Sequence, residues 1–150
     1  MPQFSGLVQT LTPSATDDNW TLDAILDEYG EIVKTFFAGE ETASAVIAGR
    51  VARVTTAGAG SGTAGNVQNF HPHSAASTIS FNTTYATSQP VLTGGAIIPY
   101  TFNAHAGVID EYTDPNFRPQ IIGLENVSCR NDVGTSAAEQ STYGVVWAEP

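Results

Sequence analysis

The sequence predicts a mainly β protein: an antiparallel β-sandwich of the jelly-roll type with one N-terminal amphipathic helix. Two observations predict the sandwich. Apolar and polar residues alternate over several short runs, which is the period of a half-buried strand. Glycine, proline, asparagine and aspartate gather between these runs at intervals of about 8–12 residues, which is the spacing of strands in sandwiches and jelly rolls.

A different period predicts the helix at residues 19–37. In this segment the apolar residues recur at steps of three and four, as they do on one face of a helix. That face consists of Leu22, Ile25, Leu26, Tyr29, Val33 and Phe36. The run 16–19 offers capping residues, and Gly39 is placed to end the helix. The acidic side chains of the segment then fall on its solvent face.

After Gly39 the period becomes two. The segments expected to be strands are 44–56, 79–85, 91–92, 98–102, 107–109, 121–129 and 143–147. Gly49 is expected to mark a bulge in the first of them, because glycine in a strand interior often does so. This part of the chain is therefore expected to form the sheets.

The 150 residues are expected to form a single domain, 1–150. Within it, residues 1–41 are an acidic N-terminal arm plus the helix, and residues 42–150 are the β-sandwich. Residues 57–66 are rich in glycine, alanine and serine, which predicts a flexible loop. This loop is no phosphate loop, because no Gly-Lys-Ser/Thr sequence follows it.

The charge excludes two classes of partner. Fifteen acidic residues oppose five lysines and arginines, and the net charge is −10. Nucleic acids and anionic membranes need clustered cations, so neither is an expected partner. Residues 1–41 hold eight of the acids and Lys34, a net −7, and this segment is where we would first look for a basic partner. No signal peptide or membrane span is recognised, so we expect synthesis in a cytoplasm.

No catalytic motif is recognised, and we predict no enzyme, no catalytic residue and no cofactor. Cys129 is the only cysteine, so it forms no internal disulfide, and we expect it to be a buried residue of a strand. The carboxylates Asp110, Glu111 and Asp114 are expected to be solvated turn residues.

Three histidines are the candidates for a metal site. His71 and His73 are two residues apart, so in a strand both point to one side, and His105 is a third possible ligand. The His-x-His pair resembles the metal motif of the cupins. That pattern needs a glutamate a few residues further on, where this chain has serine and alanine. We therefore predict no metal site and keep a cupin-like metal-binding barrel as an alternative.

Three stretches resemble the middle of phage virion jelly rolls. They are residues 98–103, which end in Phe-Asn, residues 110–119 with an Asp-Pro turn and a Phe-x-Pro entry, and residues 123–128 with a Gly-Leu start. The ending 142–147 is similar to the last strands of such modules. The resemblance implies a β-rich virion or surface-assembly subunit, and it assigns no functional residue.

We therefore predict a structural virion subunit, a phage capsid decoration (cement) protein that is made in the host cytoplasm. Its expected partners are copies of itself, in a trimer, and a major capsid or other virion protein. The low lysine content fits this role, since a surface with few long side chains loses little entropy when it becomes an interface. The other alternative is a fibre or receptor-binding module that recognises glycans. It would use the 110–114 loop and the aromatics Tyr100, Tyr112, Phe117 and Trp147.

Overall fold

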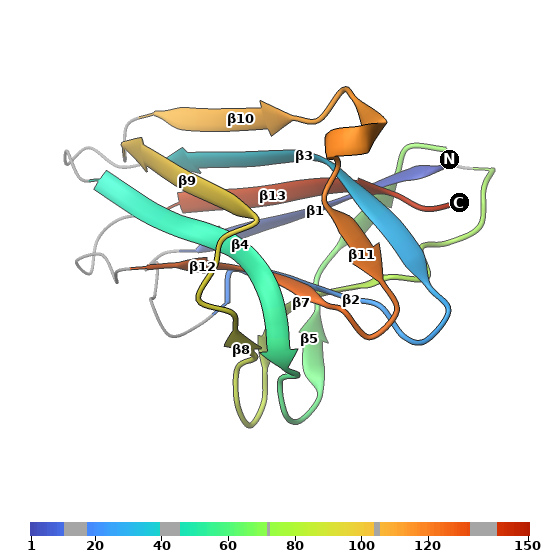
Figure 1. Cartoon of the computed structure of the whole chain (residues 1–150), viewed down its shortest axis with the longest axis horizontal. Helices are drawn as coiled ribbons and strands as arrows, with labels where there is room; N and C mark the ends of the chain where they lie inside the picture. Colours follow the sequence, from blue (N-terminus) through green and yellow to red (C-terminus); the bar gives the residue numbers. More distant parts are fainter. Residues whose placement is uncertain (11–17, 40–45, 72, 104–105, 133–140) are drawn as a thin grey trace.

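The computed structural model describes residues 1–10, 18–39, 46–71, 73–103, 106–132 and 141–150. These residues form two antiparallel sheets that pack face to face (Figure 1). The predicted β-sandwich is confirmed. Among the described residues the one helical element is the 3-10 turn η1 (Pro115–Phe117).

Sheet A follows the order β10-β3-β13-β1-β6, and β11 also pairs with β3. Its strands are β1 (Gln3–Thr10), β3 (Tyr29–Gly39), β6 (Val67–Asn69), β10 (Gly107–Glu111), β11 (Gln120–Ile122) and β13 (Ser141–Ala148). Sheet B follows the order β5-β7-β2-β12-β4-β8, and β9 also pairs with β4. Its strands are β2 (Trp20–Asp23), β4 (Val46–Thr56), β5 (Gly62–Ala64), β7 (Ser80–Tyr85), β8 (Val91–Leu92), β9 (Ile98–Asn103) and β12 (Val127–Asn131).

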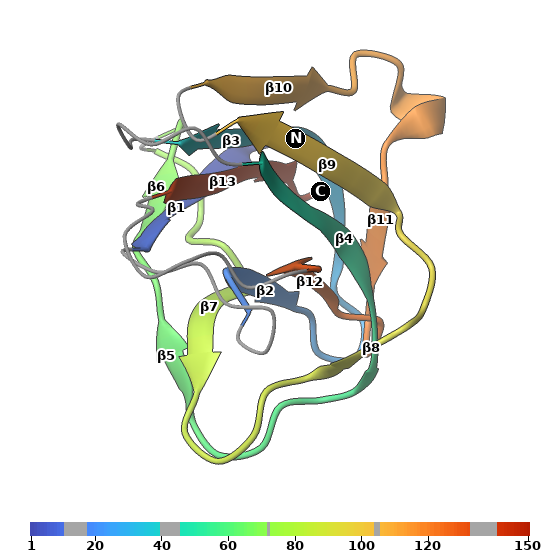
Figure 2. The same cartoon turned by 90° about the vertical axis from the view of Figure 1, so that its left-hand side faces the viewer.

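Eight of these strands are connected as in a jelly roll. The neighbours β10-β3-β13-β1 lie in one sheet and β9-β4-β12-β2 in the other, so that β1, β2, β3 and β4 alternate between sheets, as do β9, β10, β12 and β13. Strands β5 to β8 come between β4 and β9 in the chain. Strands β5, β6 and β7 extend the two sheets at the side where β6 pairs with β1 and β7 pairs with β2, as the turned view in Figure 2 shows, whereas β8 pairs with β4 at the other end of sheet B.

The core lies between the two sheets and is rich in aromatic side chains. The largest fully buried side chains are Trp20, Trp147, Tyr143, Phe4, Phe37 and Phe81. Phe37 of sheet A stacks on Tyr100 of sheet B, with 4.1 Å between ring centroids. The alternation predicted for 98–102 and 143–147 is confirmed, because every second residue of β9 and of β13 belongs to this core.

The predicted helix at 19–37 is wrong. The segment forms β2, a turn, and the eleven-residue strand β3. In β3 the register shifts: Val146 lies opposite Lys34 and Trp147 opposite Ile32, so Val33 is the extra residue of a β-bulge. A bulge reverses which residues face the core, and buried positions before and after it are then three residues apart instead of two. It also leaves Val33 and Phe36, which are three residues apart, together on the outer side of sheet A, and this step of three imitated a helical period.

The residues of the expected helical face therefore lie in different parts of the molecule. Leu22 is buried in the core, while Ile25 and Leu26 are 68% and 67% exposed in the turn between β2 and β3. Val33 packs on the outer side of sheet A with Val146. Valine, isoleucine, threonine and aromatic residues dominate β3, and these residues favour strands over helices.

Three further expectations need correction. Residues 3–10 are no arm, because β1 lies inside sheet A between β13 and β6. The 57–66 segment is not a loop along its whole length, because it contains strand β5. Gly65 also packs so closely on Phe81 that a Cβ would come within 2.4 Å of the ring. Gly49 marks no bulge, because its register to β9 and β12 is continuous.

Candidate interaction surface

The outer side of sheet A carries a row of apolar residues that runs across four strands. Ile109 of β10 lies opposite Phe36 of β3, Phe36 lies opposite Gly144 of β13, and Gly144 lies opposite Leu7 of β1. We call this row and its neighbours in the next row (Ser5, Lys34, Glu111 and Val146) the sheet A face.

The row is exposed at both ends and flat in the middle. Ile109 is 68% exposed and Leu7 is 54% exposed. Phe36 is half-buried and lies across Gly144, since a Cβ on Gly144 would come within 2.0 Å of its ring. Only glycine at position 144 lets the Phe36 ring lie flat on the sheet.

Charges on this side of sheet A are neutralised in pairs. Lys34 and Glu111 form an ion pair with 3.5 Å between Nζ and Oε2. Farther along β3, Glu31 pairs with Arg118 at 3.4 Å. A shallow hollow of about 310 Å³ adjoins the first pair and is lined by Gln3, Val33, Lys34, Phe70, Glu111 and Val146. This side therefore combines apolar exposure with little net charge.

The outer side of sheet B differs at its centre, on β2 and β12, where the side chains are polar and partly covered. Arg130 of β12 donates from Nε to Asp18 Oδ1 at 2.6 Å and from Nη2 to the Pro90 carbonyl oxygen at 2.6 Å. Burial raises the pKa of the Asp18 carboxyl, and the Arg130 charge opposes that rise. Thr21 and Ser128 are buried beside this pair and hydrogen-bond to each other at 3.0 Å.

The metal candidates do not converge in the described part of the chain. His71 and His73 are both exposed, and His105 lies outside the described residues. The His71 backbone N–H donates to Asn69 Oδ1 at 2.8 Å, which fixes the local turn. No group of three histidine, cysteine, aspartate or glutamate side chains among the described residues is placed to hold a metal ion.

The carboxylates of the 110–114 loop also point apart. Asp110 and Glu111 are consecutive in β10 and therefore lie on opposite sides of sheet A. Glu111 pairs with Lys34, while Asp114 Oδ1 accepts from the backbone N–H and from the side chain of Asn116, both at 2.9 Å. Asp114 thus caps η1, so Glu111 and Asp114 have structural partners within the chain.

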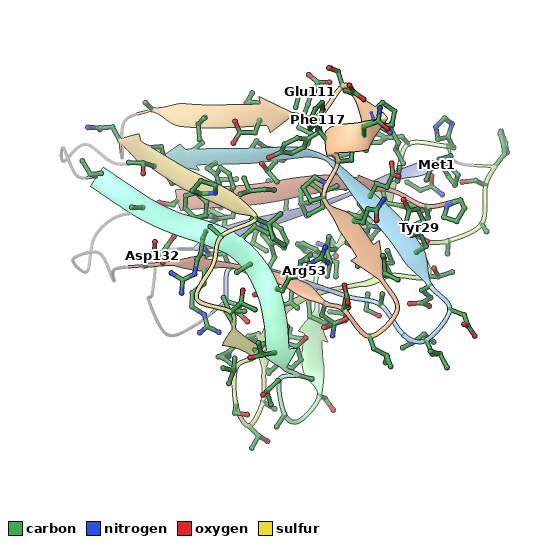
Figure 3. The ribbon with its side chains drawn as sticks, viewed as in Figure 1. Met1, Tyr29, Arg53, Glu111, Phe117 and Asp132 are labelled. Carbon is green, nitrogen blue, oxygen red and sulfur yellow. The ribbon has the colours of Figure 1, made fainter. Side chains whose placement is uncertain are left out.

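The four aromatics of the glycan alternative do not form one surface. Tyr100 and Trp147 are 4% and 0% exposed and belong to the core. Tyr112 is half-buried against the core, and Phe117 is 76% exposed at the start of the segment that leads to β11. Figure 3 shows Phe117 on the β10 side of the molecule.

One buried polar cluster was not predicted. Tyr100 Oη donates to Asn131 Oδ1 at 2.7 Å, and Asn131 Nδ2 donates to Tyr143 Oη at 3.0 Å. Cys129 and Asn19 adjoin this cluster, and Cys129 is 0% exposed, as expected of a core cysteine. Burial raises the pKa of the Cys129 thiol to about 12, so at neutral pH it is a protonated, unreactive group.

A second hollow, of about 340 Å³, opens between β6 and β7. Its lining is apolar at Phe4, Val67, Ile79 and Phe81 and polar at Asn69, Ser77, Ser80 and Asn82, with no charged side chain. The nearby Glu149 is 5% exposed, and it accepts from Trp147 Nε1 and from the Thr78 N–H, both at 2.8 Å. Glu149 thereby ties the end of the chain to the segment before β7.

The described residues form a β-sandwich with the strand order of a jelly roll, and the outer side of sheet A exposes an apolar row. Within the described residues no helix is long and apolar enough to cross a membrane. Comparison with protein-family models, with curated proteins and with solved structures finds no match to this chain.

Proposed function

We propose that this protein is a structural subunit of a larger assembly, of the phage capsid-decoration type, and that it associates with copies of itself through the sheet A face. The observation that carries this proposal is the exposed apolar row of Leu7, Phe36 and Ile109 on a side whose charges are paired. The virion as its location, and a capsid protein as a further partner, rest on the sequence resemblance.

The physical argument starts from what an isolated sandwich needs. The outer side of an antiparallel sheet that faces water is normally polar. Here two large aliphatic side chains are more than half exposed in one register row with a phenylalanine. Contiguous apolar patches of this kind mark interaction sites on soluble proteins. Because the neighbouring charges are already paired, covering the face leaves no isolated ion without water.

Light scattering coupled to size exclusion tests the proposal. We expect the wild-type protein to elute as an oligomer, with the mass of a trimer of 15.7 kDa chains. The double variant Leu7→Glu/Ile109→Glu places two like charges in the interface and should shift the protein to monomer.

The matched control is Thr84→Glu/Thr101→Glu, which adds the same two charges at exposed strand positions of sheet B. It should keep the wild-type mass. A wild-type protein that stays monomeric at every concentration tested contradicts the proposal.

A further inference from the structure

A second apolar surface lies outside the sheet A face, on two adjacent turns. One turn joins β2 to β3 and the other joins β11 to β12, and they lie side by side in Figure 1. We call the four aliphatic side chains on these turns and at the end of β11 the turn cluster. Its members are Ile25 (68% exposed), Leu26 (67%), Ile122 (45%) and Leu124 (70%).

The two turns are held together by backbone hydrogen bonds. Leu124 N–H donates to the Ala24 carbonyl oxygen at 3.1 Å, and Gly123 N–H donates to the Glu28 carbonyl oxygen at 2.9 Å. A Cβ on Gly123 would come within 2.8 Å of the Ile25 carbonyl oxygen, so the turns touch. The four aliphatic side chains are therefore displayed from a fixed base.

The backbone at Leu124 is strained for the residue it carries. Its φ is 66°, in the left-handed region, which costs a residue with a Cβ roughly 1–2 kcal/mol. Glycine or asparagine fits this conformation better. A leucine that is both strained and 70% exposed contributes little to its own fold, and such outliers concentrate where a surface has another use.

The rim of the turn cluster is acidic. Asp27 and Glu28 follow Ile25 and Leu26, and Glu125 follows Leu124. The Glu28 carboxylate caps the Ile25 N–H at 2.7 Å. Glu125 lies 4.0 Å from Arg53, which offsets its charge, so the net negative charge of the rim comes from Asp27 and Glu28. Asp27 is exposed in the turn. An apolar centre with an acidic rim is complementary to an apolar depression with a basic rim.

A second copy of this chain does not fit that description. The chain has five lysines and arginines, and each lies within 4.0 Å of a carboxylate of the same chain. An anionic membrane does not fit either, because the acidic rim would be repelled by its surface. The complementary surface must come from a different protein.

We propose that the turn cluster docks into an apolar depression, ringed by lysine or arginine, on a second kind of protein. This inference rests on the proposed function as an assembly subunit and names its second contact: copies of the chain meet at the sheet A face, and a basic partner meets the turns.

A basic amphipathic peptide tests the turn cluster directly. The probe is a synthetic helix of leucine and lysine, titrated into the 15N-labelled protein. We expect amide shifts at residues 24–28 and 122–125, and binding that weakens as salt is added, since the rim contributes by charge. A peptide with glutamate in place of lysine should not bind.

Leu124→Asn is the decisive variant. It removes the exposed leucine but suits the left-handed backbone, so we expect unchanged or higher stability together with at least tenfold weaker peptide binding. Leu7→Ser is the matched control: it removes an exposed leucine from the sheet A face and should leave peptide binding unchanged. Leu124→Asn should in turn leave the oligomeric mass unchanged, so failure of this inference and failure of the proposed function are read separately.

Three results would overturn the inference. Amide shifts outside the two turns would place the peptide elsewhere. Equal binding of the basic and acidic peptides would remove the role of the rim. Co-sedimentation with vesicles of three parts phosphatidylcholine to one part phosphatidylglycerol, if lost in Leu124→Asn, would assign the turn cluster to a membrane.

Discussion

At the scale of single residues, close approach between strands fixes several side-chain identities. A Cβ on Gly49 would come within 2.3 Å of Tyr100 Oη and 2.4 Å of the Arg130 carbonyl oxygen. From the sequence alone, this glycine suggested a bulge. The sequence shows that the strand has a residue without a side chain there, but it does not show which atoms lie where a side chain would be. The contact that requires the glycine comes from strands far away in the chain.

We expect Gly49→Ala to destabilise the protein by about 1–3 kcal/mol, since the new methyl group meets a backbone oxygen that cannot move away alone. Urea unfolding measures the change. Gly94→Ala is the control, because a Cβ there has nothing within 4 Å, and it should alter stability by less than about 0.5 kcal/mol. Equal effects of the two substitutions would refute this explanation.

The buried thiol of Cys129 and the buried phenol of Tyr143 predict that the folded protein loses stability at alkaline pH. Burial raises the pKa of the thiol from 9.0 to about 12 and that of the phenol from 10.0 to about 12. The unfolded chain releases these protons at lower pH than the folded one. Stability is therefore complete below about pH 9 and falls as pH rises towards 12, by about 1.4 kcal/mol per pH unit for each group.

Urea unfolding at several values from pH 8 to pH 11 tests this. Tyr143→Phe should flatten the decline above pH 10, because the variant has no phenol to ionise at this position. An identical decline in variant and wild type would show that the Tyr143 phenol is not responsible.

At the scale of elements, the strands with regular alternation were predictable and β3 was not. The alternation in β9 and β13 was predictable because the same side of each strand faces the core along its whole length. In β3 the bulge at Val33 changes which residues face the core, from Ile32 before it to Thr35 and Phe37 after it. The apolar spacing then resembles a helical period, and only the β-branched and aromatic composition of the segment favours a strand. The apolar surface on sheet A was also missed, since Leu7, Phe36 and Ile109 become neighbours only through strand pairing.

The ion pair of Asp18 with Arg130 joins strand β12 to the segment that leads into β2, and Arg130 also donates to the Pro90 carbonyl oxygen just before β8. The side chains are 1% and 18% exposed, so Arg130→Ala leaves a buried carboxylate without its cation. We expect a loss of about 3–5 kcal/mol at neutral pH. Removing the cation raises the pKa of Asp18 further, and a raised carboxyl pKa costs stability as pH rises, so the loss should shrink at acidic pH.

Chemical unfolding of Arg130→Ala at pH 7 and pH 5 measures both effects. The surface pair offers the control: Lys34→Ala breaks an ion pair with side chains 34% and 53% exposed and should cost no more than about 1 kcal/mol. A loss in Arg130→Ala that is small, or that grows on acidification, would contradict the assignment.

At the scale of the whole molecule, the acidic residues at positions 18–39 fall into two groups: those with partners elsewhere in the chain and those in one turn. Of the acids in residues 18–39, Asp18 and Glu31 are in ion pairs and Asp23 accepts a hydrogen bond from Asn82 at 2.7 Å. Asp27 and Glu28 lie in the turn beside the turn cluster. The expectation of a basic partner at the acidic N-terminal segment therefore narrows, as a proposal, to that one turn.

The proposed self-association predicts that thermal stability depends on protein concentration. Binding of a copy to the folded chain stabilises it by about 2.7 kcal/mol when the concentration is 100 times the dissociation constant. For a domain of about 150 residues each kcal/mol raises Tm by roughly 2–4 °C. We therefore expect Tm to rise by several degrees over a hundredfold increase in concentration.

Leu7→Glu/Ile109→Glu should remove this dependence while Leu124→Asn retains it, because only the first alters the sheet A face. A wild-type Tm independent of concentration would leave the apolar row without a partner copy.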